Sequence, residues 1–97
     1  MCSGDSKLNV EVIAYGYLMT LIGGKIVVEL NNKAVLEDLI SKLTYKIKSP
    51  NEGYIGPYKV GSDLIVLING RNIKTLKEPL SLNDGDVVTL IPPFVGG

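Results

Sequence analysis

Residues 31–48 read NNKAVLEDLISKLTYKIK, and this stretch decides the fold class. Its apolar residues recur at the spacing of one helical face. They are Val35, Leu36, Leu39, Ile40, Leu43 and Ile47. Glu37 and Asp38 lie in the first half and lysines near the end, which agrees with the helix dipole. The pattern predicts one amphipathic helix from about Lys33 to Tyr45, with an N-cap supplied by Asn31-Asn32.

Strand patterns lie on both sides of this helix. Before it, Leu8–Ala14 (LNVEVIA) alternates apolar and polar residues, as a strand with one buried face does. Lys25–Leu30 (KIVVEL) is rich in β-branched residues and predicts a second strand, joined to the first by a longer loop that contains Gly23-Gly24. After the helix, Leu64–Asn69 (LIVLIN) is a continuous apolar run, which favours a strand buried on both faces. Val87–Ile91 (VVTLI) is the last predicted strand.

The segments between these strands carry turn signals. Asn69-Gly70 and Asp84-Gly85 both favour tight turns, because these residue types tolerate positive φ. A short, weaker strand is predicted to begin at Arg71 and to end near Thr75. Lys46–Asp63 is interrupted by prolines and glycines, which predicts a long loop with room for a short turn of its own.

The order of the elements, with one helix inserted early among strands, indicates an α+β domain. One core forms if the last strand lies beside the first and parallel to it, at the centre of the sheet. This arrangement resembles the β-grasp, or ubiquitin-like, fold, in which a mixed sheet is covered by one main helix. We therefore expect a flexible leader over residues 1–7, a β-grasp domain over 8–91 and an extended C-terminal diglycine tail over 92–97.

Length and composition restrict the classes of function. Ninety-seven residues, 45% of them apolar, suffice for one domain with its own core. Ten basic residues balance ten acidic ones, so nothing predicts binding to nucleic acid or to acidic lipids. No apolar run is long enough to cross a bilayer, and the first residues do not resemble a signal peptide. We expect a soluble, cytoplasmic protein.

Side chains that usually carry catalysis or bind metals are scarce. The chain has no histidine, and its single cysteine, Cys2, lies in the polar leader, so neither a Cys/His metal site nor an internal disulfide is predicted. Asp84 and Asp86 flank Gly85, which indicates a turn rather than a metal site. No glycine-rich loop precedes a helix in the way that phosphate binding requires. We expect that the protein is not an enzyme on its own and holds no cofactor.

The C-terminal residues IPPFVGG, Ile91–Gly97, have the composition of a reactive tail. Gly96 and Gly97 have no Cβ, so they can enter a slot too narrow for other residues. Pro92 and Pro93 restrict φ and favour an extended path, which reduces the entropy lost when a partner captures the tail. Extended, the segment from Pro92 onward spans at most about 20 Å. Such a tail can carry its terminal carboxyl group into the active site of another protein.

The ending LSLNDGDVVTLIPPFVGG, residues 80–97, resembles that of the small, sulfur-carrier subunit of molybdopterin synthase. Members of this family close with an acidic-glycine-acidic turn, a strand, two prolines and a diglycine. The first hairpin, the helix and a later strand of the family are similar to residues 10–30, 31–43 and 66–70. The resemblance covers most of Leu8–Gly97, and the lengthened Lys46–Asp63 loop departs from it.

This resemblance implies a sulfur carrier without catalytic activity of its own. An adenylyltransferase related to ubiquitin-activating enzymes would consume ATP to convert the Gly97 carboxylate into an acyl-adenylate, and a sulfur donor protein would then produce a thiocarboxylate. The large subunit of molybdopterin synthase would receive the tail, and the sulfur would pass to a pyranopterin precursor. Gly96 would provide clearance, and Ile91 would contribute to the partner interface. Four further residues would guide the tail into the partner: Pro92, Pro93, Phe94 and Val95.

Three alternatives remain open. The same chemistry can serve thiamin or another thio-product, although the double proline favours the molybdopterin branch. A ubiquitin-like protein modifier would instead be joined to lysines of its targets through Gly97. In a plain interaction domain the tail would be inert, and removing Gly97 would have no effect on function.

Overall fold

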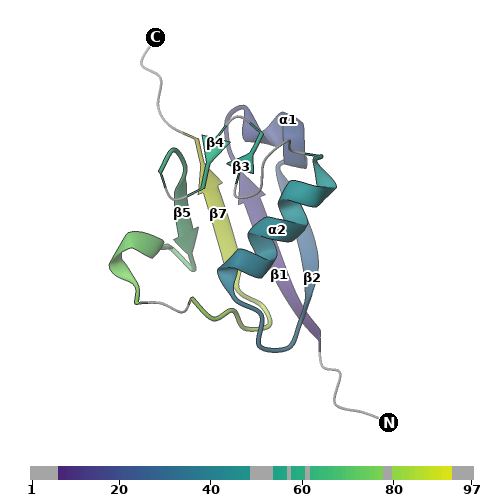
Figure 1. Cartoon of the computed structure of the whole chain (residues 1–97), viewed down its shortest axis with the longest axis vertical. Helices are drawn as coiled ribbons and strands as arrows, with labels where there is room; N and C mark the ends of the chain where they lie inside the picture. The colour runs from purple at the N-terminus through teal and green to yellow at the C-terminus, as the bar shows by residue number, and fades with distance from the viewer. Residues whose placement is uncertain (1–6, 49–53, 57, 61, 78–79, 93–97) are drawn as a thin grey trace.

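Helix α2 (Leu36–Lys46) packs across one face of a five-stranded sheet in the computed structural model, which describes residues 7–48, 54–56, 58–60, 62–77 and 80–92 (Figure 1). The strands lie in the order β2-β1-β7-β5-β6. They are β1 (Lys7–Ala14), β2 (Lys25–Asn31), β5 (Ile65–Ile68), β6 (Arg71–Asn72) and β7 (Val87–Ile91). β1 and β7 run parallel and their other neighbours are antiparallel. The predicted β-grasp fold, with its mixed sheet and one main helix, is confirmed.

Three smaller pieces complete the described chain. Helix α1 (Leu18–Ile22) lies between β1 and β2. Strands β3 (Tyr54–Ile55) and β4 (Tyr58–Lys59) pair with each other as a separate two-stranded hairpin. The 3-10 helix η1 (Ile73–Thr75) follows β6. In Figure 1, α1 and the β3–β4 hairpin lie at the end of the domain where β7 ends.

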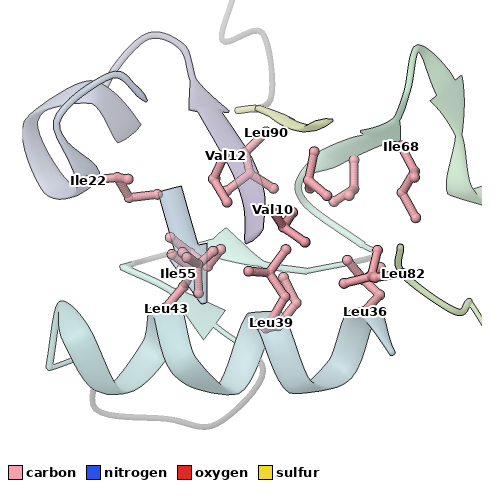
Figure 2. Packing of buried hydrophobic residues seen from close by; sticks show 14 of the residues in the cluster. Val10, Val12, Ile22, Leu36, Leu39, Leu43, Ile55, Ile68, Leu82 and Leu90 are labelled. Atoms are coloured by element: carbon pink, nitrogen blue, oxygen red, sulfur yellow. The ribbon is translucent and has the colours of Figure 1, made fainter. Parts of the chain in front are cut away.

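The core lies between the sheet and α2. Figure 2 shows Leu36, Leu39 and Leu43 pointing from α2 toward the buried side chains of the strands. The buried strand residues alternate along each strand, so they line one face of the sheet. They are Leu8, Val10, Val12 and Ala14 of β1, Val28 and Leu30 of β2, Val66 and Ile68 of β5, and Val88 and Leu90 of β7.

Leu39 provides a direct test of this packing, because its side chain is completely buried at the middle of α2. We expect Leu39→Ala to lower the free energy of unfolding by about 2–5 kcal/mol, the usual cost of a large-to-small change in a core. Ser41→Ala, on the exposed side of the same helix, serves as the control and should change it by less than about 0.5 kcal/mol. Chemical denaturation measures both values, and equal effects of the two variants would contradict this core.

The predicted start and N-cap of the main helix are wrong. Lys33 adopts a φ of 70°, and Val35 is extended, so α2 begins only at Leu36. The reason is tertiary pairing: the Leu36 amide donates to the Leu80 carbonyl at 2.9 Å, and the Leu82 amide donates to the Ala34 carbonyl at 2.9 Å. Asp38, rather than Asn31-Asn32, provides the side-chain hydrogen bond at the start of the helix: its Oδ2 accepts from the amide of the N-cap residue Val35 at 2.8 Å.

Strand β5 also differs from its prediction. It spans Ile65–Ile68 rather than Leu64–Asn69. Leu64, Val66 and Ile68 are buried whereas Ile65 is 45% exposed, so the apolar run has one buried face and not two. The predicted turn at Asn69-Gly70 is confirmed, with φ values of 53° and 85°. The weaker strand after it is confirmed only as the two residues of β6, because η1 begins at Ile73.

The predicted ends of the domain are only partly within the described residues. β1 begins at Lys7, one residue before the expected start of the domain, and β7 ends at Ile91 as predicted. The rest of the expected leader, residues 1–6, and the tail residues 93–97 lie outside the described residues. Within the described ranges, no helix is both long and apolar enough to cross a membrane.

Candidate functional site

The candidate site begins where the central strand β7 ends. β7 is held on both sides, with Ala14 of β1 opposite Leu90 and Ile65 of β5 opposite Ile91. The Tyr15 amide extends the β1–β7 pairing by donating to the Leu90 carbonyl at 3.2 Å. The chain therefore leaves the sheet at Pro92 from a position fixed by two neighbouring strands.

Of the seven predicted site residues, the structure describes two. Ile91 and Pro92 are both half-buried. The other five lie outside the described residues: Pro93, Phe94, Val95, Gly96 and Gly97. Their roles, and the roles of Ile91 and Pro92, stay predictions.

Ile91 belongs to the face of the sheet opposite α2. Its neighbours along β7, Leu90 and Val88, point into the core, so Ile91, Thr89 and Val87 share the other face. Across from Ile91 lies Ile65, which is 45% exposed. Among the described residues, no helix lies across this face (Figure 1). An apolar surface therefore adjoins the point where the tail leaves the domain.

Helix α1 was not predicted, and it lies beside the same point. The turn that leads into it passes through Gly16, and an ideal Cβ at this glycine would lie 2.9 Å from Cγ of Pro92. The sequence carries only a weak signal for α1, the spacing of Leu18 and Ile22 by one helical turn before Gly23. In the structure both side chains are buried and Gly23 is a left-handed C-cap with a φ of 102°.

The Lys46–Asp63 segment was predicted as a long loop with room for a short turn, and its described residues include the β3–β4 hairpin, which packs against the domain. The side chain of Ile55 is completely buried beside Leu43 (Figure 2). The Thr44 hydroxyl donates to the Tyr54 carbonyl at 2.9 Å, which attaches β3 to α2. Tyr58 meets Tyr17 edge to face, with ring centroids 6.4 Å apart. The β3–β4 hairpin is thereby joined to the turn that leads into α1.

Exposed apolar and aromatic side chains surround this end of the domain. Tyr15 and Tyr17 flank Gly16 and are 51% and 54% exposed, and Met19 is 51% exposed. Large side chains exposed to this degree on neighbouring positions of a short segment are typical of a contact surface. The two tyrosines lie near Pro92 in the fold, because a Cβ built on Gly16 between them would lie 2.9 Å from Cγ of Pro92.

The acidic pair Asp84 and Asp86 takes part in a turn, as the sequence predicts. Gly85 has a φ of 89°. Asp84 Oδ1 accepts from the Asn9 amide at 2.8 Å, and Asp86 accepts from the Asn83 amide at 2.8 Å and from the Asn69 side chain at 2.9 Å. Both carboxylates thus connect the start of β7 to its neighbours. Within the described ranges, no three acidic, cysteine or histidine side chains gather as metal ligands would.

The sequence matches the model of a known protein family. Residues 12–97 match the model described as the ThiS family. No curated protein matches the chain at the significance required.

Several solved structures share the fold. One described as molybdopterin converting factor subunit 1 of Pyrococcus furiosus is 27% identical, with a TM-score of 0.67, and the match covers 90% of this chain and 99% of that one. The small archaeal modifier protein 1 of Methanosarcina acetivorans is 26% identical, with a TM-score of 0.65 and coverages of 95% and 99%. A chain from the complex of subunits 1 and 2 of the molybdopterin-converting factor of Helicobacter pylori is 25% identical, with a TM-score of 0.57 and coverages of 93% and 100%.

Proposed function

Since this chain belongs to the ThiS family, whose model matches residues 12–97, we propose that it is a sulfur carrier for molybdopterin biosynthesis. In this proposal the carboxyl group of Gly97 becomes a thiocarboxylate, and its sulfur is donated to a pyranopterin precursor. The observation that carries the proposal is the position of Pro92. It follows directly on the central strand of the sheet, at the end of the domain, and leads into the sequence PFVGG.

The chemistry requires a better leaving group than a carboxylate offers. An oxygen of the Gly97 carboxylate attacks the α-phosphorus of ATP, pyrophosphate leaves, and the terminal acyl group is joined to AMP. A sulfur nucleophile equivalent to hydrosulfide then attacks the acyl carbon, and AMP leaves with the oxygen. The product is a thiocarboxylate, whose sulfur is a stronger nucleophile than the oxygen that it replaces. Both steps take place in the active site of the adenylating partner, and this chain supplies the acyl group.

The partners follow from this chemistry. An ATP-dependent adenylyltransferase and a sulfur donor protein load the tail, and the large subunit of molybdopterin synthase receives it. The complex of subunits 1 and 2 from Helicobacter pylori supports a large-subunit partner. We propose that Ile91 contacts the partner from the uncovered face of the sheet and that Pro92, Pro93, Phe94 and Val95 direct the tail inward. Gly96 would then pass the narrowest part of the channel, because it has no side chain.

Intact mass spectrometry tests the loading step. After incubation with ATP, the cognate adenylyltransferase and a sulfur source, we expect the mass of the chain to rise by the difference between one sulfur and one oxygen atom. The same mixture without ATP is the control and should leave the mass unchanged. Transfer is then tested by adding the large subunit and the pyranopterin precursor, which should return the mass to its original value. If a known carrier is loaded in the same mixture and this chain is not, the proposal is wrong.

A second candidate function is protein modification. The similarity to the small archaeal modifier protein 1 of Methanosarcina acetivorans favours it, since a modifier would need the same activated tail. In that case the acyl group passes to the amino group of a target lysine, and an isopeptide bond forms as AMP or a carrier thiol leaves. Peptides in which a target lysine carries the C-terminal tryptic segment of this chain, residues 78–97 after Lys77, would identify these products in cells. If such peptides appear and the thiocarboxylate does not form, the modifier is the correct assignment.

A further inference from the structure

We infer that Gly16 is a positioning residue for the C-terminal tail: its missing side chain leaves the space that the Pro92 ring occupies, and this contact sets the direction in which the chain leaves the domain. The inference rests on the proposed function for its biological meaning. The contact itself is a property of the fold, so it can be tested separately.

The turn that contains Gly16 is held on both sides. On one side, the Tyr15 amide donates to the Leu90 carbonyl at 3.2 Å, which ties the turn to β7 two residues before Pro92. On the other side, the Leu18 amide donates to the Tyr15 carbonyl at 3.2 Å and the Met19 amide donates to the Gly16 carbonyl at 3.0 Å. Leu18 is completely buried, so α1 is anchored in the core. The turn therefore cannot easily move away from Pro92.

Two properties of position 16 disfavour any residue that has a Cβ. Its φ is +60°, a conformation that residues with a Cβ adopt at a cost. A Cβ built there would lie 2.9 Å from Cγ and 3.7 Å from Cδ of Pro92. Unstrained carbon atoms lie about 3.5–4.0 Å apart. A proline ring has little freedom to withdraw, because it is closed onto the backbone and fixes φ near about −65°. A side chain at Gly16 therefore forces a displacement, and because the turn is held by its hydrogen bonds and by the buried Leu18, we expect the displacement at Pro92.

A small shift at Pro92 has a large effect at the end of the tail. The five residues that follow it reach at most about 17 Å when extended, so a rotation of about 10° at Pro92 would move the terminal carboxyl group by about 3 Å. Reacting atoms must approach to about 3–3.5 Å, and a misplacement of about 1 Å can cost about a hundredfold in rate. A partner that captures the tail can compensate for part of this shift, which costs binding free energy that is otherwise available for catalysis.

The chain offers a matched control. Gly23, at the C-terminal cap of the same short helix, also has a positive φ of +102°, but an added Cβ would meet nothing within 4 Å. Gly23→Ala thus introduces backbone strain near α1 without touching Pro92. Gly16→Ala introduces both the strain and the contact. Gly16→Asn separates them, because asparagine tolerates the left-handed conformation well and still carries a Cβ.

The first measurement uses the chain alone. Amide chemical shifts and residual dipolar couplings of residues 94–97 report the average direction of the tail without any partner. We expect them to change in Gly16→Ala and Gly16→Asn and to stay unchanged in Gly23→Ala. In the Pro92→Ala background the ring is gone, so adding Gly16→Ala should no longer change them. If both Gly16 variants leave the tail couplings at their wild-type values, or if Gly23→Ala changes them as much, Gly16 does not position the tail.

The second measurement follows activation by the adenylyltransferase, as ATP-dependent pyrophosphate release. We expect Gly16→Ala and Gly16→Asn to lower kcat/KM about tenfold or more relative to Gly23→Ala, at a melting temperature that differs little between Gly16→Asn and wild type. Adding Gly16→Ala to Pro92→Ala should lower it by much less than adding it to wild type. Equal kcat/KM values for the Gly16 and Gly23 variants would overturn the inference. If wild type itself is not activated, the proposed function fails, and the tail couplings still decide whether Gly16 directs the tail.

Discussion

A chain that lacks Gly97 is expected to fold normally and to lose ATP-dependent activation completely. The fold should persist because the sheet, α2 and the core all lie within residues 7–92. Activation should disappear because the shortened tail ends about 3.3–3.6 Å earlier, which is a whole residue short of the α-phosphorus of ATP. An alanine appended after Gly97 should have the same effect, since the terminal carboxyl group then carries a Cβ beside it and lies one residue too far along the channel.

The matched control for this truncation is at the other end of the domain. β1 begins at Lys7, far from the end of β7 (Figure 1). A chain without residues 2–6 should therefore be activated at the wild-type rate. Pyrophosphate release measures activation, and circular dichroism checks that every variant is folded. A folded truncation at Gly97 that still releases pyrophosphate at the wild-type rate would exclude both the carrier and the modifier.

The elements that could be predicted from sequence are those whose pattern is local. The bounds of β7, Val87–Ile91, agree with their prediction because a run of apolar and β-branched residues and the preceding Asp84-Gly85 turn are both local signals. The Asn69-Gly70 turn was predictable for the same reason. The parallel pairing of β1 with β7 followed from the need to close one core around one helix.

What could not be predicted depends on contacts between distant segments. The start of α2 is moved from Lys33 to Leu36 by pairing with residues 80–82, which no helical pattern reveals. The exposure of Ile65 results from the absence of a covering helix among the described residues, and an apolar run alone cannot show this. α1 has only five residues, too few for its periodicity to be distinguished from that of a loop.

The candidate site shows the same division. The tail residues were predicted from composition alone, because the missing side chains of a diglycine and the restricted φ of two prolines can be interpreted without knowledge of the fold. Gly16 was not predicted to be part of the site, because no pattern in the residues around it indicates that it lies beside Pro92. Its role follows only from the pairing of β1 with β7, which places the end of one strand beside the end of the other.

Gly96→Val is the second change for which we expect a very large effect. It leaves the terminal carboxyl group in place and at the correct reach, and alters only the width of the segment behind it. A valine adds three carbon atoms and restricts the backbone to fewer conformations than glycine. If the tail enters a slot that fits only bare backbone, loading and sulfur transfer should both fall at least about a hundredfold.

The series Gly96→Ala and Gly96→Val distinguishes a steric cause from a general effect of mutating the tail. Alanine adds one carbon atom and should lie between wild type and valine in kcat/KM. Val95→Ile, which enlarges the neighbouring side chain without adding a Cβ where none was, is the control and should reduce kcat/KM much less. Thermal unfolding should be the same for all of these chains, since Gly96 follows the described domain. A valine variant that is loaded and discharged as fast as wild type would show that the channel is wide at this position, and Gly96 would then have no steric role in sulfur delivery.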